Sequence, residues 1–390
     1  MSPLANGYLA DHRKLRLAGT HRAVSPETTW ERVAPSLMDY GITRVADVTR
    51  LDVIGIPVFL AVRPSSETLA VSQGKGATQL LAKISAVMES IELWHAERPA
   101  LDSFKASASS LDLPYTLDDL NVRRNVPWMS EIGMSWVPAR SLSDGRSIPV
   151  PLERVRLSYS GAHFWRPRLF QSSSTGLASG NDTIEACLHG LYEVIERDVM
   201  AHRSDGRDMN RRVVDPSTID DDHVRSLLET LRNAGVDYEI AFLSNRFGIP
   251  TFSAVVWSPL FPVVCAGSGS HLDSNVALSR AITEAVQSRL TEISSTRDDI
   301  SSDFTLARDA CPTAPFQSHS DGFHIRDVLR GQGEDFEDME RELEEVVRRV
   351  RTVAGHDPMF LELSDDSVPF SVVRVICPSL LYTEGRMLSA

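Results

Sequence analysis

A strand, loop and helix pattern that occurs twice constrains the fold more than any other feature of this chain. Gly55-Ile56-Pro57 and Gly248-Ile249-Pro250 each precede a segment rich in β-branched and aromatic residues, which predicts a strand. Each strand leads to a glycine-containing segment and then to a helix with an acidic residue, Glu89 or Glu284. The two glycine-to-glutamate separations are 34 and 36 positions. We interpret the repeat as a duplicated half-domain whose two copies face a shared site.

The length and composition fit a globular protein in which helices and strands are mixed. The 390 residues suffice for one large domain or two smaller ones, and the hydrophobic and charged fractions are 42% and 24%. We expect an α/β fold with α+β character, with an N-terminal arm and helical unit over 1–50 and one large domain over 51–390. Strands are predicted at 56–62, 68–72, 134–138, 236–243, 251–257 and 370–377, helices at 26–39, up to about 96, from 183, after 271 and at 334–353, and mostly irregular chain over 99–150 and 296–333.

The charge balance and the missing motifs disfavour several classes of protein. The net charge of −13, from 40 basic and 53 acidic residues, disfavours nucleic-acid binding, because phosphate contacts need a basic surface. No apolar run reaches about 18 residues, so no membrane span is expected, and the N-terminus has no signal-peptide core. The expected location is therefore the cytoplasm. The four cysteines are scattered and match neither a zinc motif nor a disulfide framework.

The helix that follows residues 72–76 carries two carboxylates and a hydroxyl in register. Ser85, Glu89 and Glu92 lie at i, i+4 and i+7, beside an apolar stripe that faces the core. The stripe alone indicates only a packed helix. The polar set beside it is the unusual feature.

The helix that follows residues 172–180 carries a comparable set. Glu185, Glu193 and Glu196 lie within about 80° of one another around the helix axis, and Arg197 is adjacent. The spacing from the last glycine of the preceding segment to the central glutamate is 13 positions in both helices. A third helix, after residues 267–271, follows the layout loosely with Glu284, Gln287 and Arg289.

Such a layout indicates phosphate chemistry. Glycine and serine segments at helix N-termini can expose backbone N–H groups to an anion, and Lys75 would add a point charge for a phosphate oxygen. Carboxylates need a cation between themselves and a phosphate, and Mg²⁺ prefers oxygen ligands. One Glu-x-x-Glu pair is typical of a solvated helix face, and the Gly-Lys-Gly run at 74–76 is not a Walker A motif. The residues together predict a metal-dependent enzyme that binds a nucleotide or another phosphate.

At these residues, over roughly 55–292, the chain resembles the YcaO family. The family carries three ordered motifs, Ser-x-x-x-Glu-x-x-Glu, Glu-x7-Glu-x-x-Glu-Arg and Gln-x-Arg. In this sequence they match Ser85, Glu89 and Glu92, then Glu185, Glu193, Glu196 and Arg197, then Gln287 and Arg289.

The resemblance implies a YcaO-type ATP-binding fold with pseudo-symmetric halves, ATP and Mg²⁺ as cofactors, and a catalytic domain over 51–390. ATP would phosphorylate the oxygen of a peptide backbone amide after a nucleophile adds to it. A Cys, Ser or Thr side chain would give an azoline, an amine an amidine, and a sulfur donor a thioamide. By resemblance the Mg²⁺ ligands or their supports are Glu89, Glu92, Glu185, Glu193 and Glu196. The implied nucleotide contacts are Lys75, Ser85, Arg197, Gln287 and Arg289.

The motifs identify no general base, and His21, His189 and His271 are the candidates. Many relatives have Asn where this chain has Thr175, and many azoline-forming relatives end in Pro-x-Pro-x-Pro, which residues 382–390 lack. A hydroxyl at 175 cannot replace the amide of Asn, and the lack of the proline motif at 382–390 disfavours the standard azoline reaction.

The expected partner is a ribosomally made precursor peptide, and a homodimer is expected. No fused leader-peptide-binding domain is recognised, which implies a leader-binding partner or an unusual mode of substrate capture. Residues 19–22 and 41–47 resemble YcaO proteins that stand alone or act with a TfuA-type partner, a group tied to thioamides. The alternative is a non-catalytic nucleotide-binding scaffold or sensor with the same fold.

Overall fold

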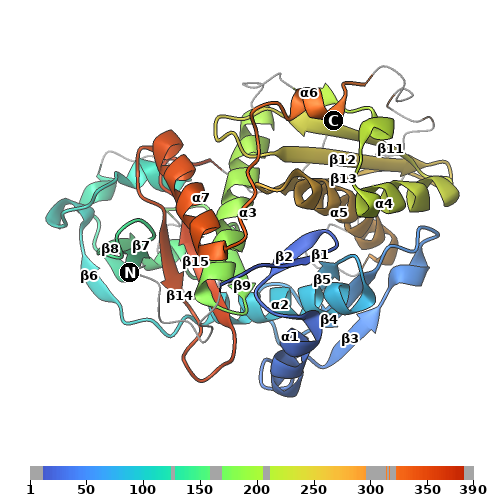
Figure 1. Cartoon of the computed structure of the whole chain (residues 1–390). Coiled ribbons are helices and arrows are strands. Elements are labelled where there is room, and N and C mark those ends of the chain that lie inside the picture. The colour runs from blue at the N-terminus through green and yellow to red at the C-terminus, as the bar shows by residue number, and fades with distance from the viewer. Residues whose placement is uncertain are drawn as a thin grey trace.

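The computed structural model describes residues 12–123, 128–158, 169–204, 211–295, 313, 316 and 322–381. Three larger antiparallel sheets and the helices between them make up this part of the chain (Figure 1). None of the described helices is long and apolar enough to cross a membrane. Much of 296–333, expected to be loop-rich, and the tail 382–390 lie outside the described residues.

The predicted repeat is present as two hairpins, each followed by a long helix. In the first copy β3, β4 and β5 form a three-stranded sheet before α2; in the second β10, β11, β12 and β13 form a four-stranded sheet that packs against α5. The bounds of the first copy are Arg44–Asp47, Val58–Val62, Val71–Lys75 and, for α2, Gln79–Glu97. Those of the second are Arg211–Val213, Asp237–Leu243, Thr251–Ser258, Phe261–Ser270 and, for α5, Ser274–Ser294, with α4 at Asp222–Asn233. The match of β4, β5 and α2 to β12, β13 and α5 is the internal pseudo-symmetry that the sequence predicts. Because β3 pairs with β4, one sheet contains strands from both sides of the domain boundary proposed at residue 50. The division into two units at this residue stays a prediction.

A six-stranded sheet takes four strands from the chain between the two copies and two from the chain after the second copy, and it packs against α3 and, through it, α7. Its order is β6-β7-β14-β15-β9, with β8 paired to β7. The strands are Phe104–Ala106, Met134–Ser141, Ser147–Pro151, Leu177–Gly180, Met359–Glu362 and Ser371–Ile376, for β6, β7, β8, β9, β14 and β15. The helices are Thr183–Ser204 for α3, Met339–Ala354 for α7 and Ile325–Val328 for the short α6.

The stretch 99–150, expected to be mostly irregular with a strand at 134–138, supplies β7 at that place and two further strands, β6 and β8. The missed signal is Asp144-Gly145, a dipeptide typical of tight hairpin turns. Gly145 has a φ of +73°, and β7 and β8 pair on either side of it.

The N-terminal unit consists of a small hairpin, β1 (Leu15–Leu17) and β2 (Thr20–Arg22), followed by α1 (Pro26–Val33). Ser25 caps α1 as predicted, accepting a hydrogen bond from the backbone N–H of Thr28 at 3.2 Å. The α-helix was expected to reach residue 39, but it gives way to a 3-10 turn at Ala34–Ser36. Pro35 accounts for the early end, because proline lacks an N–H and clashes with the preceding turn of an α-helix.

The small-residue segments before α2 and α5 are strand ends and not loops, whereas the segment before α3 is a short loop over 173–176 that runs into β9. The prediction of anion-binding loop backbone is therefore corrected before α2 and α5. The three segments include the ends of β5, β9 and β13. A Cβ on Gly74 would lie 2.0 Å from the backbone N of Ala86, and one on Gly267 would lie 2.3 Å from that of Ala285. The glycines therefore let each strand pack directly on the backbone of the following helix. Thr78 and Asp273 cap α2 and α5 through side-chain oxygens.

Candidate active site

Three glutamates, Glu89, Glu92 and Glu193, converge where α2 and α3 meet the end of β9; we call them the acidic cluster. Glu92 Oε1 accepts a hydrogen bond from Ser179 Oγ at 2.5 Å. Glu193 Oε2 accepts one from the backbone N–H of Gly176 at 3.1 Å, and Glu89 Oε2 accepts one from the backbone of β5 at 2.8 Å. The neighbouring strands therefore orient all three carboxylates.

The acidic cluster has too much negative charge for its surroundings. Burial, with the nearby charges of Glu89 and Glu193, raises the pKa of Glu92 to about 8 despite the hydrogen bond from Ser179. Burial and Glu196 also raise the pKa of Glu193, and Arg197 only partly offsets them. Buried carboxylates that face one another without sufficient counter-charge favour protonation or a bound cation. Because the donors are carboxylate oxygens, the cluster fits a hard divalent ion such as Mg²⁺.

A basic rim borders the acidic cluster on the side of α5. Arg197 lies 3.7 Å from Glu193 and 4.0 Å from Glu196, and Lys75 Nζ lies 2.7 Å from Glu284 Oε2. Burial opposes the charge on Arg197, but Glu196, Glu193 and Glu284 outweigh burial and raise its pKa. Similarly, burial opposes ionisation of Glu284, while Lys75 and Arg197 lower its pKa. Arg197 and Glu284 therefore stay charged, and the basic side chains of Arg197 and Lys75 are suited to the phosphates of a nucleotide.

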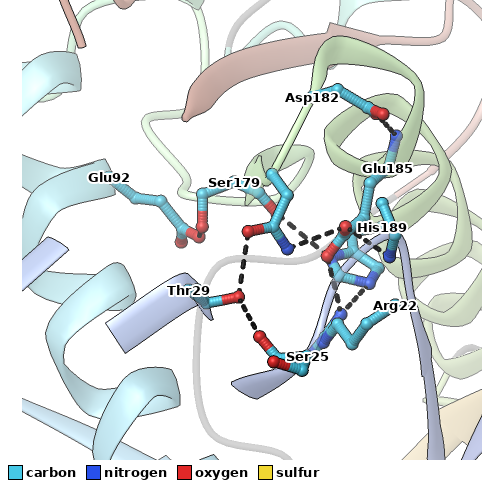
Figure 2. Close-up of polar contacts among 10 residues, drawn as sticks. Arg22, Ser25, Thr29, Glu92, Ser179, Asp182, Glu185 and His189 are labelled. Atoms are coloured by element: carbon cyan, nitrogen blue, oxygen red, sulfur yellow. Dashed lines mark hydrogen bonds and ion pairs between the residues drawn. The ribbon is translucent and has the colours of Figure 1, made fainter. Parts of the chain in front are cut away.

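Glu185 belongs to a group of polar contacts around Arg22 (Figure 2). It is 3% exposed, and its Oε2 accepts hydrogen bonds from the backbone N–H of Ala23 and from Asn181 Nδ2, both at 3.0 Å. Arg22 lies 3.5 Å from Glu185 Oε1, and its charge is also felt by Glu92. With three donors already present, Glu185 supports the β1–β2 hairpin in this structure; a place as direct metal ligand stays a prediction.

Two of the three candidate bases have both ring nitrogens engaged. His189 Nδ1 lies 3.0 Å from the carbonyl oxygen of Ser179, and its Nε2 faces Arg22. His271 Nδ1 accepts the backbone N–H of Asp273 at 2.9 Å, and its Nε2 lies 3.4 Å from Glu342. Burial, with nearby positive charges, holds the pKa of both imidazoles well below the usual value. Neither is placed to accept a further proton without losing a contact.

The third candidate, His21, points away from the residues that contact the acidic cluster. It is buried, with Nε2 3.4 Å from Asp273 Oδ2 and its ring edge-on to His271 at 5.2 Å. Side chains alternate across a strand, so His21 and the adjacent Arg22 of β2 lie on opposite faces. The assignment of His21 as general base stays a prediction, and its position does not favour it.

His21, His271 and Glu342 lie close enough together to resemble a metal site. The hydrogen bond that His271 Nδ1 accepts from a backbone N–H requires a proton on Nε2 in the neutral ring, which leaves no lone pair there for a metal. Lys14 also forms a buried ion pair with Glu342, and Tyr192 donates a hydrogen bond to it. This group is therefore a buried polar network that fastens the N-terminal arm to α5 and α7.

The remaining predicted nucleotide contacts fall in different surroundings. Ser85 is half-buried on α2, and Gln287 Nε2 donates to the carbonyl oxygen of Gln73 at 3.4 Å. Arg289 is fully buried, with Nε 2.7 Å from Asp52 Oδ2 and Nη1 3.3 Å from the carbonyl oxygen of Phe261. In this structure Arg289 joins the two pseudo-symmetric halves, and a nucleotide contact would require this ion pair to open.

Sequence reasoning missed several side chains that converge on the same place. Arg22 reaches the site from the hairpin, and Thr29 Oγ1 of α1 donates to Asn181 Oδ1 at 2.9 Å (Figure 2). Arg280 of α5 is close enough to affect the pKa values of Arg22 and His189. The Gly-Thr-His-Arg run drew attention to its histidine, whereas the arginine next to it makes the contact with α3. No local pattern in the sequence indicates that contact, because 163 positions separate Arg22 from Glu185.

Comparison with known proteins gives the family. The family model described as YcaO cyclodehydratase, ATP- and Mg²⁺-binding, matches residues 73–381. An uncharacterized protein of Mycobacterium tuberculosis is 44% identical over 286 residues, which are 73% of this chain and 65% of that protein; this chain thus spans about two thirds of that relative. A Rhizobium leguminosarum bv. trifolii protein, named for its place in the tfuA 3′ region, is 39% identical over 299 residues, 72% of this chain and 69% of its own. A Methanothermobacter thermautotrophicus protein is 34% identical over 368 residues, 92% of this chain and 94% of its own.

Solved structures with the same fold agree with this match. YcaO from Methanopyrus kandleri, bound with AMPPCP and Mg²⁺, has a TM-score of 0.69 at 20% identity and covers 95% of this chain and 94% of its own. A heterocyclase in complex with substrate and cofactor has a TM-score of 0.75 at 19% identity, covering 95% of this chain and 55% of its own. These likenesses confirm the predicted fold class. The sequence, the fold and the family model agree, and the chain belongs to the YcaO family, which binds ATP and Mg²⁺.

Proposed function

We propose that this protein uses ATP and Mg²⁺ to activate a backbone amide of a ribosomally made peptide, by phosphorylating the amide oxygen. The observation that carries the proposal is the acidic cluster, in which burial and the neighbouring carboxylates raise the pKa of Glu92 to about 8, bordered by the basic side chains of Arg197 and Lys75. This pairing suits a phosphate chain with a divalent ion held between it and the carboxylates.

The proposed roles follow from where the side chains lie. Glu89, Glu92 and Glu193 would hold Mg²⁺, and Glu196, whose Oε1 accepts a hydrogen bond from Ser268 at 2.7 Å, would support them. A bound Mg²⁺ would neutralise charge on the phosphate oxygens. Arg197 contacts Glu193, Lys75 pairs with Glu284, and Arg22 is close enough to Glu92 for their charges to interact. Cations fixed in this way can stabilise the charge that develops as a phosphoryl group is transferred.

The nucleophile decides the product, and the observations favour a sulfur donor over a side chain. One relative lies in a tfuA region, and the resemblance ties TfuA-associated YcaO proteins to thioamides. We therefore propose a TfuA-like partner and a thioamide product, with azoline or amidine formation as the other outcomes. The reaction would take place in the cytoplasm, where ATP and new peptides meet, and we keep the predicted homodimer as part of the proposal.

The non-catalytic alternative, a nucleotide-binding scaffold or sensor, predicts different properties for the same site. A scaffold needs tight binding of ATP but no turnover that responds to a peptide. An enzyme needs the cations to contact the transferred phosphate, so turnover should require both the peptide and the complete acidic cluster.

The test combines binding and turnover on the purified chain. We expect a non-hydrolysable ATP analogue to bind in calorimetry only when Mg²⁺ is present. The Glu193→Gln variant should lose ATP turnover and remain folded. Glu229→Gln on α4, at an exposed position away from the site, is the matched control and should turn over ATP like the wild type. Absence of Mg²⁺-dependent binding in the wild type would refute the proposal.

The product is then read by mass spectrometry on a candidate precursor peptide incubated with the chain, ATP, a TfuA-like protein and sulfide. Exchange of one oxygen for sulfur supports the thioamide, and loss of one water supports an azoline or amidine. Tight ATP binding with no change of any peptide and no peptide-stimulated turnover supports the scaffold.

A further inference from the structure

A fully buried arginine adjoins the acidic cluster on the side of the six-stranded sheet. Arg374 lies in β15, which is flanked by β14 and β9, and its side chain is among the largest that are fully buried. Its Nη2 donates a hydrogen bond to the carbonyl oxygen of Ser173. Its charge also reaches Glu193 and counteracts the rise in the pKa of that carboxyl. A buried arginine is costly to desolvate. We therefore ask which neighbouring groups Arg374 holds in place.

Arg374 contacts the loop over residues 173–176, and the last residue of this loop contacts Glu193. Within the loop, Ser173 Oγ donates to Thr175 Oγ1 at 2.8 Å and accepts the backbone N–H of Thr175 at 3.1 Å. The next residue, Gly176, donates its N–H to Glu193 Oε2 and accepts the N–H of Val375 at 2.7 Å. The arginine and its neighbour in β15 therefore hold the two ends of this short loop.

Gly176, at the end of the loop, is packed so closely against β15 that its backbone cannot shift towards that strand. Gly176 has a φ of +82°, and a Cβ on it would lie 2.2 Å from the carbonyl oxygen of Val375. Its N–H points at Glu193 because the loop is held tightly against β15. The N–H of Val375 holds the carbonyl side of Gly176, while the contact between Arg374 and Ser173 holds the side of the loop that leads to its N–H.

We propose that Arg374 is a positioning residue, which fixes the 173–176 loop so that the N–H of Gly176 orients the carboxylate of Glu193 for cation binding. The inference rests on the proposed function, because it assumes that Glu193 binds Mg²⁺. It extends that function to a side chain outside the motifs. Groups that orient metal ligands typically change metal affinity by about 10–100-fold when they are removed.

A second fully buried arginine, Arg154, offers a matched control, because it also contacts the chain that precedes β9. Arg154 Nη1 donates to the carbonyl oxygen of Gln171, two positions before Ser173. Its removal should disturb the fold to a similar degree without touching the part of the loop that contacts Glu193. If Arg374 only stabilises the fold, substitution of either arginine should weaken binding of the Mg²⁺-loaded ATP analogue. If Arg374 positions Glu193, only the substitution of Arg374 should weaken it.

The experiment measures binding of a Mg²⁺-loaded, non-hydrolysable ATP analogue by calorimetry, together with thermal unfolding, for the wild type and three variants. We expect Arg374→Met to weaken binding by about 10–100-fold, Arg374→Lys to recover part of this loss, and Arg154→Met to stay within about twofold of the wild type. In turnover assays, Arg374→Met should need more Mg²⁺ for half-maximal rate, while Arg154→Met should not.

Three outcomes count against the inference. Equal binding by Arg374→Met and the wild type would overturn it, and so would equal weakening by Arg154→Met and Arg374→Met. If Arg374→Met does not fold, Arg374→Lys carries the test, and unchanged binding and Mg²⁺ requirement in that variant would refute the role. Absence of Mg²⁺-dependent binding in the wild type would instead refute the proposed function.

Discussion

Two glutamates on α2, five positions apart, show how differently one helix can treat the same side chain. Glu97 is fully buried, and its oxygens accept hydrogen bonds from Arg63 Nη1 and Nη2, both at 2.7 Å, and from Ser66 and Thr68. Burial opposes its ionisation, but these donors win and lower its pKa to about 2. Glu92 has one hydroxyl donor and faces two other carboxylates, and its pKa is raised to about 8.

The difference separates a completed ion pair from an incomplete site. Glu97 has its counter-charge within the protein, so its carboxylate contributes to folding. Glu92 lacks one, so the folded protein holds it at an energetic cost that a bound cation would remove. Groups whose surroundings oppose their ordinary charge state are typical of functional sites. The same substitution at the two positions should therefore have opposite consequences.

The largest effect expected is on the stability of the Glu97→Gln variant. The substitution leaves the Arg63 guanidinium buried without its counter-charge, which costs about 3–5 kcal/mol. Denaturant unfolding followed by circular dichroism should show this loss, while the folded fraction still binds the Mg²⁺-loaded ATP analogue. A loss below about 1 kcal/mol would show that the Arg63–Glu97 pair is no stronger than a surface pair.

The next effect is on turnover in the Glu92→Gln variant. At neutral pH the metal-free carboxyl is mostly protonated, given its pKa of about 8, so an amide should change stability little. The amide cannot replace a charged ligand, and we expect ATP turnover to fall by about 100-fold or more. Normal turnover, or instability like that of Glu97→Gln, would break the contrast between the two positions.

The pH dependence of metal-free stability provides a smaller, independent measure of the same contrast. Folded Glu92 keeps its proton up to about pH 8, while the unfolded chain loses it near the ordinary value of about 4.3. Since the folded state then binds more protons, this residue makes stability fall as pH rises through that window. Glu97 has the opposite sign, because its contribution is present above the ordinary value and is lost as pH falls towards about 2.

Unfolding free energies measured from pH 5 to 8.5 without metal should fall as the pH rises, and part of this slope should come from Glu92. Glu92→Gln should remove that part of the slope. Saturating Mg²⁺ with the ATP analogue should flatten the slope in the wild type, because the bound form needs the ionised carboxylate. A wild-type slope that neither change reduces would contradict the raised pKa.

The sequence predicts that Glu89, Glu92 and Glu193 lie together because helical periodicity is local, but it groups Glu185 with them, and Glu185 instead contacts Arg22, Ala23 and Asn181. Glu89 and Glu92 lie one turn apart on any regular helix, and the repeated spacing correctly pairs α2 with α3. It does not predict what the glycines do, because a glycine in a turn and one pressed against a helix look the same in sequence. Gly74 and Gly267 turned out to be of the second kind.

Long-range contacts are the other part that the sequence does not reveal. Arg22 meets α3 across 163 positions, and Arg374 meets Ser173 across 201. No periodicity connects such residues, and only the packed sheets place them together. Arg289 shows the same limit in reverse, since its motif implies a nucleotide contact while its neighbours include Asp52.

The smallest effect concerns an ion pair that matches Arg63–Glu97 in distance but not in burial. Arg326 Nη2 lies 2.7 Å from Asp220 Oδ2, with the two side chains 77% and 72% exposed. Water screens both charges in the folded state, so Asp220→Asn should change stability by less than about 1 kcal/mol, and added salt should reduce the change further. The same denaturant titration used for Glu97→Gln measures it. If both substitutions cost the same, distance alone would set the strength of these pairs, and burial would not explain the large cost expected for Glu97→Gln.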